Sequence, residues 1–175
     1  MADLVKNKYI SPNKLGLFLN ELGEDTPVEI GSGKNSVQQK GTGAVARGDN
    51  SVATGNGVAS GKYSHSEGQD GEASGDWSHN EGGYTFAKGD RSHAEGNTTY
   101  AEGTNSHAEG INTRAYGQNS HTEGADTISG DANKIDDTDQ ATGYGWNSHA
   151  EGNGSIAHGS TTHAEGYHTV ANGFA

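Results

Sequence analysis

The sequence predicts an all-β repeat protein, a parallel two-sheet β-roll (solenoid) built from 14-residue coils. Three observations point to it: 17 of the 29 glycines fall on a seven-residue grid, small and large residues alternate within each unit, and a Ser-His-x-Glu-Gly segment returns in every second unit. Only 29% of the 175 residues are hydrophobic, so few large apolar side chains are available for an ordinary globular core. Fixed glycine spacing favours a repeat architecture over disorder.

The glycine grid sets the length of the repeating unit. It runs without interruption from Gly61 to Gly124, resumes at Gly152, and is preceded by Gly41, Gly48 and Gly55 with one residue missing before Gly61. A coiled coil of this period would need apolar seam residues, and collagen would need glycine at every third position. Neither is present. Alternation within each unit is a strand signal, so we expect a short strand and a tight turn in which the glycine supplies a positive φ.

The true structural period is two units. Ser-His-x-Glu-Gly begins at Ser64, Ser78, Ser92, Ser106, Ser120 and Ser148, and at Thr162 with threonine in first place. The intervening units differ from it, as in Thr85-Phe-Ala-Lys-Gly89. Two strands per coil predict two parallel sheets. The third and fifth residues of each unit are small and should fill the narrow interior, while the fourth and sixth should point outward.

These motifs resemble a known family. Asn50-Ser-Val-Ala-Thr-Gly55 is similar to the head repeat of YadA-like trimeric adhesins, and the Ser-His-Ala-Glu-Gly form is similar to repeats in phage and prophage fibre-like structural proteins. The resemblance covers residues 33–173 and implies a left-handed β-roll assembled as a parallel homotrimer. The sequence shows no signal peptide, coiled-coil stalk or membrane anchor of that family, which favours a virion part over a bacterial surface adhesin.

One outward face repeats strictly and is our main candidate for function. Water selects no particular side-chain pair, whereas a neighbouring chain repeats with every coil, so we expect this face at the trimer interface. A solvated charge ladder is the alternative. The candidate residues are His65, Glu67, His79, Glu81, His93, Glu95, His107, Glu109, His121, Glu123, His149, Glu151, His163 and Glu165.

The chemistry expected of this face follows from its two residue types. Stacked carboxylates repel, and interleaved imidazoles relieve the repulsion, so we expect raised histidine pKa values and stability that declines as pH rises through them. Zinc remains an alternative because both side chains are ligands, although we assign no metal and no cofactor. A Ser-His-Glu catalytic triad is disfavoured because the serine should point to the opposite face from the histidine.

The N-terminal segment, residues 1–32, differs from the repeats. Ser11-Pro12 is a good helix start, and a short apolar helix should follow and end before Gly23. Such a helix is too short to be stable alone, so we expect it to pack on its trimer mates or to attach the protein to a capsid or tail protein. Residues 26–33 should form a linker to the roll, residues 33–175. The attachment candidates are Leu15, Leu17, Phe18, Leu19 and Leu22.

A second departure from the grid lies at residues 130–145. The repeat resumes in phase after it, so we expect a loop that projects from the roll. A tolerated surface insertion explains it best. Contact with a receptor is the weaker alternative, and calcium is weaker still because the spacing matches no EF-hand. The residues concerned are Asp131, Asp136, Asp137 and Asp139.

The remaining composition restricts the function class. The chain has no cysteine and a formal net charge of -12, which argues against a disulfide framework and against binding of nucleic acid. No apolar run is long enough to span a membrane. We therefore expect a non-enzymatic fibre protein on a phage virion, a head fibre or tail-associated fibre, or alternatively the head of a bacterial surface adhesin. Expected partners are two further copies, a capsid or tail protein, and a host receptor or glycan.

Overall fold

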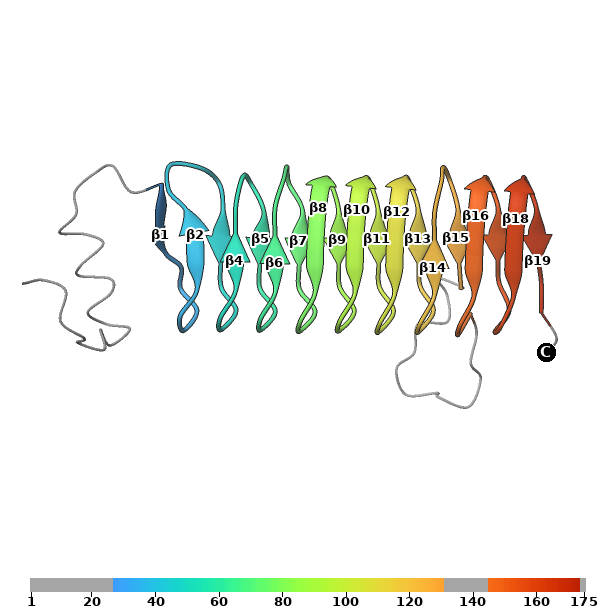
Figure 1. Cartoon of the computed structure of the whole chain (residues 1–175), viewed down its shortest axis with the longest axis horizontal. Coiled ribbons are helices and arrows are strands. Elements are labelled where there is room, and N and C mark those ends of the chain that lie inside the picture. The colour runs from blue at the N-terminus through green and yellow to red at the C-terminus, as the bar shows by residue number, and fades with distance from the viewer. Residues whose placement is uncertain (1–26, 131–144, 174–175) are drawn as a thin grey trace, which may run out of the picture.

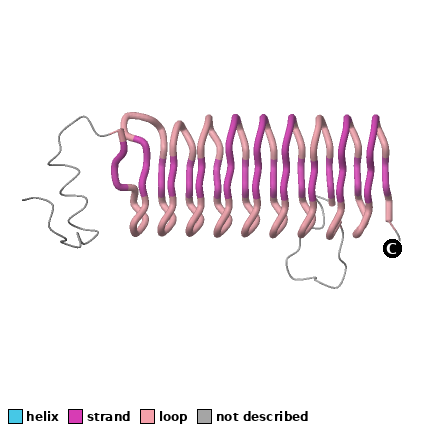
Figure 2. The backbone as a smooth tube through the Cα atoms, in the orientation of Figure 1, coloured by secondary structure: helices cyan, strands magenta, loops and turns pink. Residues whose placement is uncertain are grey.

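The computed structural model describes residues 27–130 and 145–173. Within them the chain winds back and forth between two sheets, and each coil adds one strand to each sheet (Figures 1 and 2). The predicted β-roll is therefore confirmed. The strands are β1 (Val28–Ile30), β2 (Val37–Gln39), β3 (Val45–Ala46), β4 (Val52–Ala53), β5 (Val58–Ala59), β6 (His65–Ser66), β7 (Glu72–Ala73), β8 (His79–Gly83), β9 (Phe86–Ala87), β10 (His93–Asn97), β11 (Tyr100–Ala101), β12 (His107–Ile111), β13 (Arg114–Ala115), β14 (His121–Thr122), β15 (Ile128–Ser129), β16 (His149–Asn153), β17 (Ile156–Ala157), β18 (His163–Tyr167) and β19 (Val170–Ala171).

Even-numbered and odd-numbered strands belong to different sheets. Sheet A contains β1 and the even-numbered strands from β2 to β18, and sheet B contains the odd-numbered strands from β3 to β19. All pairings are parallel except that of β1 with β2. Equivalent residues of successive coils stand opposite one another, as His93 does to His107. A side chain that recurs in the sequence therefore becomes a straight column on the molecule.

The interior is thin and lined by small side chains, as the alternation predicted. Ala87, Ala94 and Ala101 are fully buried, and so are the threonines Thr85 and Thr99. Several interior hydroxyls bond to the turn before them; the Oγ of Ser64, for example, donates to the Gly61 carbonyl at 2.7 Å. Backbone ladders between coils supply most of the remaining polar pairing, such as the His65 amide donating to the Ser78 carbonyl at 2.9 Å.

The turn glycines serve two different purposes. The prediction that they supply a positive φ holds for one set of turns and is wrong for the other. Gly82 closes a Ser-His-x-Glu-Gly unit with a φ of +104°, as expected. Gly89 closes the alternate unit without a left-handed φ; a Cβ there would collide with the Gly103 carbonyl of the next coil. The left-handed position of that turn falls instead on a non-glycine residue two places later, Arg91, at 56°. Close stacking of coils, rather than φ, requires glycine there.

One coil carries a larger polar residue in the interior, which is accommodated by its neighbours although its Oδ1 has no hydrogen-bond partner. Asn80 occupies a position that alanine or another small residue fills elsewhere, and it is fully buried. Its Nδ2 donates to the Thr85 hydroxyl at 3.0 Å. The room comes from Gly71, where a Cβ would collide with the Asn80 amide. Shape complementarity within the roll therefore extends across the two sheets.

The two departures from the grid have different outcomes. The linker expected over residues 26–33 is wrong in part, because β1 lies within it and pairs antiparallel with β2 across the first edge of sheet A. At the second departure, β14 pairs directly with β16, so the repeat resumes in register. The expected helix, its attachment residues from Leu15 to Leu22 and the loop aspartates lie outside the described residues.

Candidate functional site: the histidine and glutamate ladder

The repeated face lies on the outer side of sheet A, and we call it the ladder. Its histidines form one continuous stack from β6 to β18, because the register places each imidazole above the next. Successive ring centroids are 4.8 Å apart, and the rings are nearly parallel. The glutamates run beside them, two residues further along each strand. The predicted ladder geometry is confirmed; its place at a trimer interface stays a prediction.

Most histidine nitrogens of the ladder lie close to a carboxylate without bonding to it. The Nε2 of His79 is 4.0 Å from a Glu67 oxygen, and the Nε2 of His93 is 3.9 Å from a Glu95 oxygen. His149 and Glu151 approach to 3.6 Å. These separations exceed hydrogen-bond reach. Only between His121 and Glu109, at 3.3 Å, does the ladder form a histidine–glutamate hydrogen bond among the described residues.

The same nitrogens are shielded from water. The rings of His79 and His93 keep 35% of their side-chain surface exposed. Their Nε2 atoms, however, are buried and have no hydrogen-bond partner, and the same holds for His107 and His149. A buried polar atom without a partner ordinarily destabilises a fold. The ladder therefore presents a row of unsatisfied nitrogens beside carboxylates.

The histidine pKa values move opposite to the sequence-based prediction. Burial lowers the pKa of His79, His93, His107 and His149, and the neighbouring imidazoles lower it further. The glutamates raise it by less. Pairing with glutamate was expected to dominate, but stacking each ring between two others both desolvates it and surrounds it with like groups. These four histidines are therefore held neutral at pH 7.

The glutamates respond to one another in an alternating way. Hydrogen bonding with Glu109 and burial raise the pKa of Glu95 to about 7. Bonding with Glu151 raises the pKa of Glu123. The pKa values of Glu81 and Glu109 are lowered, in each case first by the hydrogen bond from Glu95. Carboxyl groups stacked along the coil axis thus share protons, because not all of them can be ionised together.

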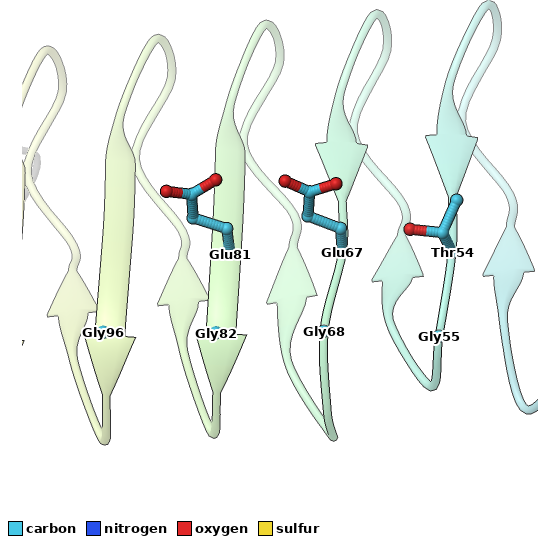
Figure 3. A pocket seen from close by; sticks show the side chains of 7 residues that line it. All are labelled: Thr54, Gly55, Glu67, Gly68, Glu81, Gly82 and Gly96. Carbon is cyan, nitrogen blue, oxygen red and sulfur yellow. The ribbon is translucent and has the colours of Figure 1, made fainter.

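A shallow groove runs beside the carboxylates. Its lining residues are Thr54, Gly55, Glu67, Gly68, Glu81, Gly82 and Gly96, and its volume is about 560 Å³. Figure 3 shows the glutamates standing on successive coils, with a row of glycines further along the same strands. Glycine is required along this row because a Cβ at Gly82 would collide with the backbone of the next coil. Small cationic or polar ligands therefore have access to the glutamate column.

The outer side of sheet B is chemically different. Its central column is mostly apolar or aromatic and contains Val45, Val58, Glu72, Phe86, Tyr100, Arg114, Ile128, Ile156 and Val170. The sequence marked this face as irregular, but the mostly apolar column became evident only with the strand register. At a turn, the exposed rings of Tyr63 and Trp77 also stack, with centroids 5.8 Å apart; sequence analysis missed this pair because turn positions vary in type.

The serine and histidine of each motif lie on opposite faces. Ser78 is 2% exposed within the roll and donates to the Gly75 carbonyl, whereas His79 points outward. A nucleophile and its base must converge within hydrogen-bond distance. The motif therefore does not assemble a serine triad within one coil.

What the ladder does assemble is groups of metal-ligating atoms. Five groups of three side chains place their ligand atoms within 4.8 Å of one another. The sequence showed the residue types but not that the imidazoles of His79, His93 and His107 each lie near the carboxylates of their own and the preceding coil. The described residues include no helix able to cross a membrane. Comparison with protein-family models, curated proteins and solved structures finds no match for this chain.

Proposed function

We propose that this chain is a non-enzymatic structural fibre protein of a phage virion, a head fibre or tail-associated fibre, which assembles as a parallel homotrimer. The N-terminal segment attaches it to a capsid or tail protein, and the roll projects outward to meet a host receptor or glycan. The single observation that carries this proposal is a roll that keeps one register along the described coils, with one face that repeats His and Glu from β6 to β18, a form suited to a rigid spacer.

The ladder is the proposed trimer interface. Its column is continuous with Val37 and Val52 on β2 and β4, which occupy the position that His65 occupies on β6. Apolar residues thus begin the column that histidines continue. In a parallel homotrimer, each coil of one chain lies beside the equivalent coil of its neighbour. A face that repeats from coil to coil can therefore make the same contact many times.

Single-cysteine cross-linking tests the interface directly, because the chain has no cysteine of its own. Equivalent residues approach one another near a threefold axis, and a disulfide needs Cα atoms about 4.4–6.8 Å apart. We expect His107→Cys to give a covalent dimer under oxidation, and the matched Arg114→Cys on sheet B to give none. Cross-linking by Arg114→Cys alone would reverse the assignment of the faces.

Two measurements test the assembly and its location. Light scattering of the purified protein should give three times the chain mass of 18.0 kDa. Mass spectrometry should find the protein in purified virions. A monomer mass contradicts the trimer, and recovery from bacterial envelopes without particles favours a surface-adhesin head instead.

A further inference from the structure

We propose that the ladder binds transition-metal cations of the zinc class, in a row of sites each formed by histidine and glutamate side chains of a single chain. The inference uses only contacts within one chain. It therefore does not rest on the fibre proposal.

The spacing between the ligand atoms suits such a cation. Zinc binds imidazole nitrogen and carboxylate oxygen at about 2.0–2.2 Å, so two of its ligands stand about 3.3 Å apart in a tetrahedron and up to about 4 Å apart at wider angles. The observed separations are 3.6 Å for His149 with Glu151 and 3.9 Å for His93 with Glu95. These gaps are too wide for a hydrogen bond and fit a bridging ion, while the widest pairs of a group, up to 4.8 Å apart, must close by side-chain rotation on binding.

The unsatisfied nitrogens supply a second, independent observation. Four Nε2 atoms of the stack are buried and lack any partner, although each belongs to at least one of the three-residue groups. A bound cation would satisfy the lone pair of each neutral imidazole that it contacts. It would also offset the repulsion along the glutamate column, where carboxyl groups on paired strands follow one another.

The donor set indicates the kind of metal. Calcium and magnesium prefer all-oxygen ligands, whereas imidazole suits zinc, copper and nickel. Each of the five groups includes at least one histidine. The groups are Glu67, His79 and Glu81; Glu81, His93 and Glu95; Glu95, His107 and Glu109; His121, Glu123 and His149; and His149, Glu151 and His163.

Shared ligands limit how many ions bind at once. The first three groups overlap through Glu81 and Glu95, and the last two share His149. At most three groups can be chosen without a shared ligand, for example those centred on His79, His107 and Glu123. We therefore expect about three tightly bound Zn²⁺ ions per chain.

Zinc titration of the full chain tests this, with bound metal counted after equilibrium dialysis in 150 mM salt and millimolar Ca²⁺. The variant H79N/H107N/H149N leaves only the group of Glu81, His93 and Glu95 intact, so we expect about one Zn²⁺ per chain. Adding His93→Asn breaks all five groups, and tight binding should be lost by at least tenfold in affinity. The matched control H158N/H168N removes two exposed histidines outside the ladder and should retain all three ions.

A second variant guards against misfolding of the histidine substitutions. E67Q/E81Q/E95Q/E109Q keeps side-chain shape and removes carboxylate repulsion, so the roll should form while the first three groups lose zinc. Equal loss in H158N/H168N, full retention by the quadruple histidine variant, or displacement of zinc by Ca²⁺ would each overturn the proposal.

Discussion

The outer faces of sheets A and B are built on the same coils, yet they carry different chemistry. Sheet A repeats His and Glu from β6 to β18, whereas sheet B places valine, aromatic, charged and isoleucine residues in the same column. On sheet A the neighbours along the column are like groups, which shift one another's pKa values. On sheet B the column is mostly apolar, and charged neighbours beside it are complementary, as in the 2.8 Å bridge between Lys88 and Glu102.

Comparing the two faces shows which outward-pointing residues the coil itself requires and which repeat for another reason. Sheet B shows that the coil tolerates many outward residues, because its interior of serine, threonine and alanine is unchanged beneath them. The repetition on sheet A therefore has a cause outside the coil. A partner chain and a row of cations are the two causes proposed above, and both act on the ladder alone.

The largest losses of stability should follow substitution of the turn glycines, whose roles differ between the Ser-His-x-Glu-Gly units and the alternate units. Gly82→Ala meets both a left-handed φ and the Gly96 carbonyl, while Gly89→Ala meets the Gly103 and Glu102 carbonyls without a left-handed φ. We expect losses of about 2–6 and 1–3 kcal/mol in unfolding free energy, respectively. Denaturant titration measures both. The control Gly83→Ala, whose Cβ would contact only the Asn97 amide at 3.2 Å, should change little; equal losses at all three positions would contradict the stacking argument.

On sheet B, stability should depend on complementary neighbours. Tyr100 stacks on Phe86 with centroids 5.0 Å apart, and the cations of Lys88 and Arg114 lie within 5.5 Å of its ring. Tyr100→Ala should cost about 1–2 kcal/mol by thermal or denaturant unfolding. Tyr100→Phe keeps the ring and should cost less than about 0.5 kcal/mol. An equal cost for both would place the effect in the hydroxyl instead.

Removing one carboxylate should change the free energy of unfolding in opposite directions on the two faces. The pKa of Glu95 is raised to about 7, above its unfolded value of about 4.3, so its contribution to stability is present at low pH and is lost as pH rises through 7. Glu95→Gln should therefore stabilise the protein at pH 8 by about 1 kcal/mol, allowing for solvent screening. Glu102→Gln breaks the bridge to Lys88 and should destabilise it by about 0.2–1 kcal/mol. Unfolding curves at pH 8 that shift the same way for both variants would contradict this contrast.

Sequence periodicity predicted the two sheets, the small interior and the ladder, because a strict register converts spacing into position. It did not predict the second role of the glycines, since contact between coils depends on how closely backbones stack; Gly89 looks like Gly82 in the sequence. Nor did it predict the sign of the histidine shifts. Alternation places His93 beside Glu95 on one face, but burial within the ring stack is a property of the assembled coils. Residues Leu15 to Leu22 and Asp131 to Asp139 lie outside the described residues, so those predictions stand as made.

The smallest effect expected is the acid response of the histidine stack. The pKa values of His79, His93, His107 and His149 are lowered first by burial and then by neighbouring imidazoles. Since the unfolded histidine pKa is about 6.5, their contribution is present above pH 6.5 and is lost as pH falls through their folded values. The raised pKa of Glu95 acts in the opposite direction between pH 4.3 and 7, so melting temperature alone mixes the two.

NMR titration of the imidazole protons, with a chelator present, measures the histidine pKa values separately from the Glu95 contribution. The four histidines should titrate below the ordinary histidine pKa of about 6.5. His107→Asn should raise the pKa of His93 by removing a like neighbour from the stack. If the ladder histidines instead titrated above pH 6.5, glutamate pairing would dominate the stack, and sheet A would be held together by complementary neighbours in the same way as sheet B.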